Sequence, residues 1–285
     1  MKSLMGFAAS VSRRGVLQLP QKRTNLKGKT KKMKAKLMMM GVAAALATGA
    51  MAEITNTVKV TKFHQSHPYS GKATVEYAVG GVQLWENGPY WAECNVGATK
   101  PKEYGYYFWW GDTVGYKRKN GAWVASDGST SSFTFSSGNA PTCNKNNAAL
   151  LSAGYIDSTG NLAAAHDAAT AHLGSPWRMP TSDEIQALVD NCTTTWITTN
   201  GVYGRLVTGK GTYANRSIFL PAAGYGDGSY LLNNPDFGYF WSSTPNSGTS
   251  NYAWRLDFDS SDFHWYGDLY RYCGQSVRPV RGFAE

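Results

Sequence analysis

Acidic side chains are absent from the first 52 residues. This segment holds 11 of the 28 Lys and Arg residues of the 285-residue chain and none of its 19 Asp and Glu residues. The rest of the chain therefore carries 17 basic against 19 acidic residues, a net charge of −2. A body so close to neutral lacks the positive patch with which proteins bind nucleic-acid phosphates. We therefore expect no nucleic acid among the partners.

A membrane span is not expected either, because the apolar stretch Leu37–Leu46 falls well short of the roughly 20 apolar residues that a spanning helix needs. Four lysines between Lys31 and Lys36 precede this stretch, and Ala50-Met51-Ala52 follows it. Such an order is typical of a cleavable secretory signal peptide, and a retained membrane anchor is the alternative. We expect export through a signal peptide that ends at Ala52, to the medium or the cell surface, with no membrane span after cleavage.

Three regions follow from these patterns. We predict a basic extension plus signal peptide over residues 1–52, an N-terminal strand segment over 53–80, and one domain over 81–285. Met33 is an alternative to Met1 as the start of translation. Removal of the signal peptide leaves 233 residues, enough for one well-buried domain.

Cysteines are few and lack metal-binding spacing. None of the four (Cys94, Cys143, Cys192, Cys273) is part of a C-x-x-C or Cys/His pattern, so a structural zinc site is not expected. Export permits disulfides, and four cysteines allow three pairings between which the sequence does not choose. Buried free thiols are the alternative for Cys94 and Cys192. We expect no cofactor and no metal ligand.

Catalytic motifs are not evident. The sequence contains no G-x-S-x-G turn and no paired-carboxylate motif. His166, Asp167 and His172 do not share one helical face, so we expect them to be surface polar residues. We therefore predict no catalytic residue and no enzyme.

Apolar periodicity predicts helices in the middle of the chain and strands after it. Two alanine-rich helices are predicted on either side of 157–160, a short one from Ala148 and a second over about Ala163–Leu173. A third helix is predicted from Thr181 or Ser182 to Cys192, closed by Trp196. Strands are predicted over 202–207, 217–224, 238–244, 253–258 and 276–281, and a loop over 117–145. In the strand 253–258, Trp254, Leu256 and Phe258 should face one side, and Arg255, Asp257 and Asp259 the other. The aromatic block Tyr106–Trp110 should pack in the core, with a ligand-stacking platform as the alternative.

Five sequence blocks occur in a recognisable order: Trp91–Ala98, Trp177–Thr181, Leu220–Gly224, Tyr239–Thr244 and Gly274–Val280. Together they resemble the Fibrobacter succinogenes major paralogous domain, a relative of the DUF1566 family and of formylglycine-generating-enzyme-like folds. The resemblance covers about residues 80–282. It implies an α+β, C-type-lectin-like fold with two helices packed on small twisted antiparallel sheets and long ligand-presenting loops.

The C-terminal part resembles the variable region of proteins that retroelements diversify by mutating adenines. All residues of Asp259–Cys273 except Trp265 belong to the set that such mutation reaches. We therefore predict a variable binding region over 241–281. Aromatic rings with polar tips give large contact area at low rotamer cost, which is typical of adaptable binding surfaces. The predicted ligand-binding residues are Asn246, Asn251, Tyr252, Arg255, Asp257, Asp259, Asp262, His264, Trp265, Tyr266, Asp268, Leu269, Tyr270, Tyr272 and Cys273. Core filling is the alternative for these rings, and we expect it for Phe263.

The predicted function is non-enzymatic binding of a protein or glycan on another cell or surface. One alternative is a structural cell-surface or fimbrial module. Another is a calcium-dependent glycan-binding lectin, which Asn234-Pro235-Asp236 faintly resembles although a Trp-Asn-Asp element is missing. An enzyme related to formylglycine generation would need a reactive cysteine pair or a cysteine-bound copper, and the placement of Cys192 and Cys273 does not suit either. We expect Arg178, Arg278 and Arg281 to brace the fold rather than to bind anions.

Overall fold

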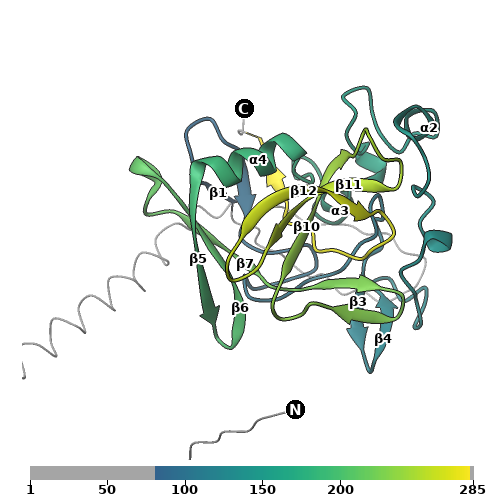
Figure 1. Ribbon diagram of the computed structural model, residues 1–285, viewed down its shortest axis with the longest axis horizontal. Helices are drawn as coiled ribbons and strands as arrows, with labels where there is room; N and C mark the ends of the chain where they lie inside the picture. Colours follow the sequence, from purple (N-terminus) through teal and green to yellow (C-terminus); the bar gives the residue numbers. More distant parts are fainter. Residues whose placement is uncertain (1–80, 283–285) are drawn as a thin grey trace, which may run out of the picture. The chain divides into compact units, whose positions relative to one another are not determined.

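The structure is a computed structural model that describes residues 81–282 (Figure 1). The predicted signal peptide and the predicted strand segment 53–80 lie outside the described residues. Within these residues, thirteen strands form five small antiparallel sheets, and the three α-helices are short. The predicted α+β, C-type-lectin-like fold with two helices is therefore wrong. The described chain is β-rich, and only α4 (Ser182–Asn191) is longer than six residues.

The five sheets are built from strands that follow one another in the chain, with one exception. The sheet β1-β2-β13 joins β1 (Gly81–Gln83) and β2 (Tyr90–Ala92) to β13 (Val280–Arg281), from the other end of the domain. The others are β3 (Tyr116–Lys119) with β4 (Ala122–Ala125); β5 (Cys192–Thr199), β6 (Val202–Gly209) and β7 (Ser217–Pro221); β8 (Tyr225–Asp227) with β9 (Tyr230–Leu232); and β10 (Gly238–Pro245), β11 (Tyr252–Phe258) and β12 (Phe263–Tyr270).

The helices occupy the middle of the chain. Besides α4 they are α2 (Asn147–Ser152) and α3 (Ala168–Leu173), with 3-10 turns η1 (Ser137–Asn139), η2 (Ala164–His166) and η3 (Gly211–Tyr213). The caps Asn146 and Asp167 accept the N–H groups of Ala149 and Thr170, and six residues follow each cap. Asp167 is buried rather than a surface residue as predicted, because it also accepts the N–H of Met179 at 2.8 Å.

Asn-Gly turns close two of the hairpins. Asn120-Gly121 joins β3 to β4 and Asn200-Gly201 joins β5 to β6, and all four residues have positive φ. Asn and Gly adopt this conformation at little steric cost, and it matches the twist of two-residue hairpins. The segment 117–145, predicted as a loop, therefore contains a hairpin. The predicted helix stops at Asn191, and Cys192 to Thr199, including Trp196, form a strand.

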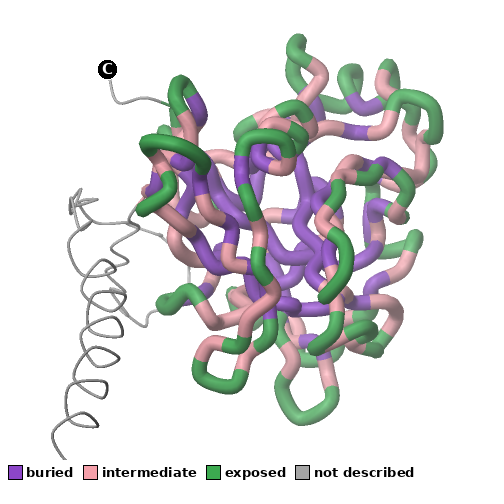
Figure 2. Tube along the Cα trace, turned by 60° about the vertical axis from the view of Figure 1, so that its left-hand side comes forward, coloured by how far each residue is buried: buried purple, intermediate pink, exposed green. Residues whose placement is uncertain are grey.

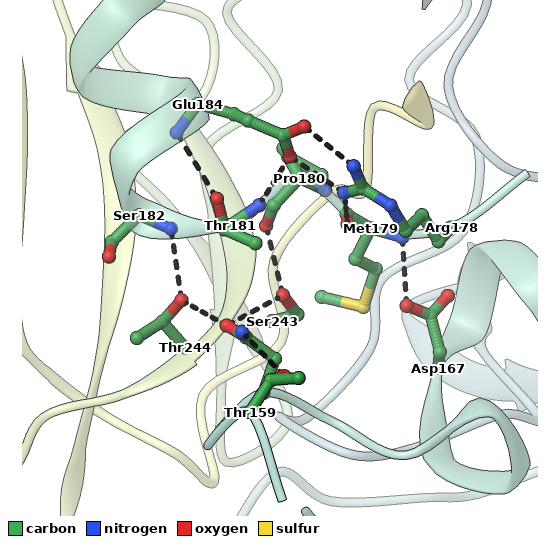
Figure 3. Close-up of polar contacts among 11 residues, drawn as sticks. Thr159, Asp167, Arg178, Met179, Pro180, Thr181, Ser182, Glu184, Ser243 and Thr244 are labelled. Carbon is green, nitrogen blue, oxygen red and sulfur yellow. Dashed lines mark hydrogen bonds and ion pairs between the residues drawn. The ribbon is translucent and has the colours of Figure 1, made fainter. Parts of the chain in front are cut away.

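The start of α4 is tied to the neighbouring sheet by a network of polar contacts (Figure 3). Thr181 and Glu184 form a reciprocal capping box, which satisfies N–H groups that the first helical turn leaves free. Arg178 makes a bidentate ion pair with Glu184 at 2.6 and 2.7 Å. The N–H of Ser182 donates to Oγ1 of Thr244 on β10 at 2.9 Å. The predicted helix start and the bracing role of Arg178 are confirmed.

The core is rich in tryptophan. Trp91, Trp110, Trp123 and Trp241 are fully buried, and the buried segments run through the interior of the described domain (Figure 2). Trp110 donates its indole N–H to the carbonyl of Ser242, and Trp241 donates to the carbonyl of Phe108, both at 2.9 Å. Since these bonds cross between the aromatic block 106–110 and β10, this block packs in the core as predicted.

Arg278 is buried, and no carboxylate within residues 81–282 forms an ion pair with it. Its guanidinium donates to Oδ1 of Asn95 and to the carbonyls of Ala92, Glu93 and Phe219, at 2.9 to 3.1 Å. Burial lowers its pKa to about 10, because a desolvated guanidinium is a less stable cation. These bonds join β2, β7 and the last segment of the chain, so the bracing role predicted for Arg278 is confirmed.

Arg281 packs on aromatic rings, and the cysteines form no disulfide within residues 81–282. The guanidinium of Arg281 lies over the rings of Tyr90 and Trp177, at 4.5 and 5.5 Å from their centroids. All four cysteines are free thiols in the structure. No helix within residues 81–282 has the length and apolarity that crossing a membrane would require.

Candidate binding surface

The sheet β10-β11-β12 presents two different faces, because side chains alternate along each strand. On one face Leu256 and Phe258 join the core cluster that includes Ile185 and Leu188 of α4. The other face carries Arg255 and Asp257, as the alternation predicted. We call this side the Arg255 face. Besides these two residues it contains Tyr239 of β10 and His264, Tyr266 and Asp268 of β12.

Arg255 is the centre of this face. It is almost completely buried, and it binds Asp257 at 2.8 Å and Asp268 at 2.6 Å through separate nitrogens. Its guanidinium also lies 5.6 Å from the ring centroid of Tyr239 and 5.9 Å from that of Tyr266. Carboxylates and rings from three strands therefore hold one cation in place, which makes the face rigid.

Burial changes the acid–base properties of the residues around Arg255. It raises the pKa of Asp257, and the positive charge of Arg255 counteracts this shift. It also raises the pKa of Tyr239 to about 12, although Asn233 donates a hydrogen bond to the tyrosine hydroxyl at 2.8 Å. At neutral pH Tyr239 is therefore protonated beside the paired Arg255.

A group of three tyrosines adjoins the Arg255 face. The rings of Tyr252 and Tyr270 meet edge to face at 4.8 Å, and those of Tyr270 and Tyr272 stack at 5.1 Å. A hydrogen bond with Tyr270 raises the pKa of Tyr252, and the charge of Asp268 acts in the same direction. Asp268 is therefore close to both groups, so the Arg255 face and the tyrosine group form one continuous surface.

Every second residue of β12 from His264 onward is exposed to solvent. These residues are His264, Tyr266, Asp268 and Tyr270, and the residues between them are wholly or partly buried. The alternation places polar and aromatic side chains outward on a strand whose other side chains pack inward. These four predicted ligand-binding residues are available to a partner, while ligand contact itself stays a prediction.

Two of the other predicted binding residues brace turns. Asn246 accepts the N–H of Gly248 at 2.8 Å and donates to the carbonyl of Gly267 at 2.5 Å, which ties the β10–β11 turn to β12. Asp259 accepts the N–H groups of Ser261 at 2.6 Å and Asp262 at 2.8 Å. These bonds lower the pKa of Asp259, chiefly through Asp262. Their side chains are therefore engaged in shaping the surface, while Asp262 points to solvent next to His264.

Four further predicted residues lie inward. Trp265 packs on Trp254, with ring centroids 4.4 Å apart, on the face opposite Arg255. Leu269 packs on a second core cluster, and Cys273 is buried, which raises its pKa. Asn251 is half-buried, and its side-chain oxygen has no hydrogen-bond partner among the described residues. We leave these four residues out of the proposed surface.

Arg271 is fully buried beneath the end of β12 and holds it in place from the interior of the domain. Its guanidinium donates to the carbonyls of Tyr252 at 2.8 Å, Thr142 at 3.1 Å and Lys145 at 2.7 Å. Burial lowers its pKa to about 10. Arg271 therefore clamps the tyrosine group to the loop that precedes α2, and it supports this group without lying on the surface.

Sequence reasoning missed the contributions of β8 and β10. The rings of Tyr225 and Tyr239 meet edge to face at 5.1 Å, and Tyr239 pairs with Asp257 across the sheet. Period-two alternation within the strand 238–244 was the available signal, because it places Tyr239 on the side opposite Phe240. Nothing in the sequence around Tyr225 indicated that β8 would approach this sheet.

No group of three or more His, Cys, Asp or Glu side chains in the described part of the chain could hold a metal ion. In the lectin-like tripeptide, Asn234 donates its side-chain amide to the carbonyl of Ala222 at 3.2 Å. This bond braces a turn and leaves Asp236 exposed beside it.

The part of the chain that contains this surface is similar to a known protein family. Residues 142–281 match the family model of the Lcl C-terminal domain. The Lcl match begins in the loop that Arg271 clamps and ends in β13, so it includes the whole sheet β10-β11-β12 but not β1 to β4. The match supports the resemblance in part, over residues 142–281, and gives no separate evidence for the Fibrobacter succinogenes major paralogous domain or for the DUF1566 family. No significant match was found among the curated proteins or among the solved structures.

Proposed function

We propose that this is an exported, non-enzymatic binding protein that recognises a protein or glycan on another cell or surface. One observation carries the proposal: β12 exposes His264, Tyr266, Asp268 and Tyr270 in alternation, on a backbone that buried residues hold rigid. Exposed aromatic and polar side chains on a fixed scaffold suit recognition, because little conformational entropy is lost on binding.

The match to the Lcl C-terminal domain supports a C-terminal recognition domain of variable sequence. All strands of the proposed surface lie within the matched residues, and the residues that brace it (Arg255, Arg271) are buried. Diversification by a retroelement is part of the proposal. It would act on the exposed residues of β12 and leave the buried scaffold intact.

A non-enzymatic role is supported by the state of the thiols. Burial raises the pKa of Cys192 to about 12 and also raises that of Cys273. Reactive cysteines need the opposite shift, because the thiolate is the nucleophile and the metal ligand. Chemistry of the formylglycine-generating kind is therefore not part of the proposal.

Sequencing this gene from several isolates tests the proposed function. Substitutions should concentrate at Asp262, His264, Tyr266, Asp268 and Tyr270, whereas buried neighbours of these residues should stay constant. The exposed threonines of β5 (Thr193, Thr195, Thr198) are the matched control, because they lie on a strand outside the surface. Equal variation at the threonines and at β12 would indicate neutral surface drift and contradict the proposal.

Export has its own test. N-terminal sequencing of the protein recovered outside the cytoplasm should begin at Glu53. A protein that stays in the cytoplasm with its first 52 residues intact would contradict this part of the proposal.

A further inference from the structure

We infer that the surface formed by the Arg255 face and its adjoining tyrosines binds a basic protein surface, one from which Lys or Arg side chains project. The inference rests on the proposed function and names the class of partner. It follows from the sign of the exposed charge and from the kind of rings exposed beside that charge.

Among the Asp, Glu, Lys and Arg side chains of the segment 238–273, the exposed ones are all acidic, and the half-exposed imidazole of His264 lies 3.4 Å from Asp262. The side chains of Asp262 and Asp268 are 67% and 69% exposed. Both basic residues of the segment, Arg255 and Arg271, are buried. The nearby Arg205 of β6 is buried too, and its guanidinium donates to the carbonyl oxygens of Asp259 and Asp262. A partner that approaches this surface therefore meets carboxylates and no free cation of the segment.

The ion pairs of the Arg255 face leave an excess of negative charge. One guanidinium serves two carboxylates, those of Asp257 and Asp268. Asp257 is the less exposed of the two and holds Arg255 from within the sheet. Asp268 extends into solvent, where its second oxygen can accept a hydrogen bond from an incoming ammonium or guanidinium group.

The rings beside these carboxylates also favour a cation. Tyr266 is 45% exposed, and its ring already lies 5.9 Å from one guanidinium, that of Arg255. Tyr270 is 40% exposed next to Asp268. The π-electron face of a tyrosine attracts Lys and Arg side chains, and a carboxylate nearby strengthens this attraction. Tyrosine is also among the residues that contribute most to protein–protein binding.

An acidic surface disfavours the other partner classes. Sulfated or carboxylated glycans and nucleic acids carry negative charge, which like-charge contact with Asp262 and Asp268 would repel. A neutral glycan would stack on the tyrosines without any use for the two exposed carboxylates. A partner with projecting Lys or Arg side chains uses both features.

Selection from a random dodecapeptide display library on the immobilised full-length chain tests the inference. Peptides rich in Lys and Arg should be enriched on the wild type and not on D262N/D268N, in which both side chains keep their shape and lose their charge. The variant D183N/D190N is the matched control, because it removes two exposed aspartates from α4. A second pair compares Y266A/Y270A with Y203A, since Tyr203 on β6 is 44% exposed, almost the same as Tyr266.

The affinity of one synthesised, enriched peptide completes the test. Its Kd should rise about three- to tenfold in D262N/D268N and about tenfold or more in Y266A/Y270A, with no change in either control. Added salt should weaken its binding to the wild type. Thermal melts of each variant exclude unfolding as the cause.

The remaining outcomes separate the two proposals. Enriched peptides without excess Lys and Arg that lose affinity in Y266A/Y270A would overturn the basic partner and leave the proposed function standing. Peptides that bind Y266A/Y270A as well as the wild type, or no enrichment on the wild type, would overturn both.

Discussion

Arg255, Arg271 and Arg278, three of the four buried arginines among the described residues, use different acceptors. The acceptors distinguish the arginines that support the fold from the one that lies at the proposed surface. Arg271 and Arg278 donate to backbone carbonyls, so they join segments distant in sequence. Arg255 binds carboxylates, one of which extends into solvent. Arginine suits both tasks because its five donors form a planar, rigid fork. Of the three, only Arg255 is positioned to affect recognition directly.

Replacing Arg278 should therefore destabilise the whole domain. In R278M the carbonyls of Ala92 and Phe219 lose their donor while they stay buried, and unsatisfied buried acceptors are costly. We expect a loss of about 3–5 kcal/mol in the free energy of unfolding, measured by urea denaturation. R278K is the control for charge: its single ammonium cannot reach acceptors on both strands, so it should also lose stability. Wild-type stability in R278M would contradict the role of Arg278 as a clamp.

Asp112 should make stability depend on pH. This buried carboxyl accepts the N–H groups of Val114 and Gly115, both at 2.9 Å, and burial raises its pKa to about 6. Between about pH 4 and pH 6 the folded state thus binds a proton that the unfolded state, with a pKa near 3.9, has lost. The stability that Asp112 contributes is therefore complete below about pH 4, falls as the pH rises to about 6, and is constant above that.

The variant D112N isolates this effect, because an amide keeps the shape of the side chain and does not titrate. The free energy of unfolding of the wild type, relative to D112N, should decrease by about 2–3 kcal/mol between pH 4 and pH 7. A direct comparison is needed because carboxyls with a lowered pKa, such as Asp259, act with the opposite sign. Parallel pH profiles for the two proteins would show that Asp112 titrates normally.

At the scale of elements, β12 depends on a close approach between its following turn and β8. Gly226 and Gly274 exchange two backbone hydrogen bonds, at 2.7 and 2.8 Å, and the ring of Phe135 packs over both. A Cβ on Gly274 would lie 2.3 Å from Cζ of Phe135. The absence of a side chain here lets the displayed strand meet the hairpin that carries Tyr225.

G274A should therefore lower the free energy of unfolding by about 1–3 kcal/mol, because an overpacked core must shift to make room. It should also weaken ligand binding, since Tyr225 and the tyrosine group move with these two segments. G138A is the matched control, because a Cβ there meets nothing within 4 Å and the backbone is unstrained. Thermal melts of the two variants measure the difference, and equal stabilities would contradict the close packing.

Element prediction succeeded where the signal was local. The alternation of β11 predicted both faces of the sheet correctly, and the cap candidates Thr181 and Ser182 predicted the start of α4. The hairpin β3–β4 and the strand β5 were missed, although Asn120-Gly121 and Asn200-Gly201 are strong hairpin signals. The polar composition around Asn120-Gly121 favoured a loop over 117–145. The helix predicted to end at Trp196 left no room for a strand before Asn200-Gly201. Outward exposure of Tyr266 and Tyr270 was predictable from alternation, whereas the inward position of Cys273 depends on contacts far along the chain.

At the scale of the whole molecule, small sheets are joined by single bridges between distant segments. Phe108 pairs with Gln275, Gly226 with Gly274, and Arg178 with Val280. Such contacts have no periodicity in the sequence, so the packing of the sheets could not be derived from local patterns. Local patterns predicted β6, β7, β10, β11 and β13, whereas β8, β9, β12 and the fold class were not predicted.

The residues that match the Lcl C-terminal domain do not include β1 to β4, which pack with them in the described domain. A fragment of residues 142–285 contains every strand of the binding surface but lacks β1 and β2. In the full chain β13 pairs with β2, so β13 has no partner strand in the fragment. The fragment also lacks Trp110, whose indole N–H donates to a carbonyl of β10, and Ala92, whose carbonyl accepts a hydrogen bond from Arg278.

We expect the fragment to show no cooperative unfolding transition in urea and no near-ultraviolet circular dichroism from ordered rings, unlike the full-length chain. Adding residues 81–141 as a separate polypeptide should restore part of both signals, because the missing acceptors and the fully buried Trp91 then return. A cooperative transition of the fragment alone, with the midpoint of the full chain, would show that the matched residues form an independent domain and that the buried bonds to β2 contribute little.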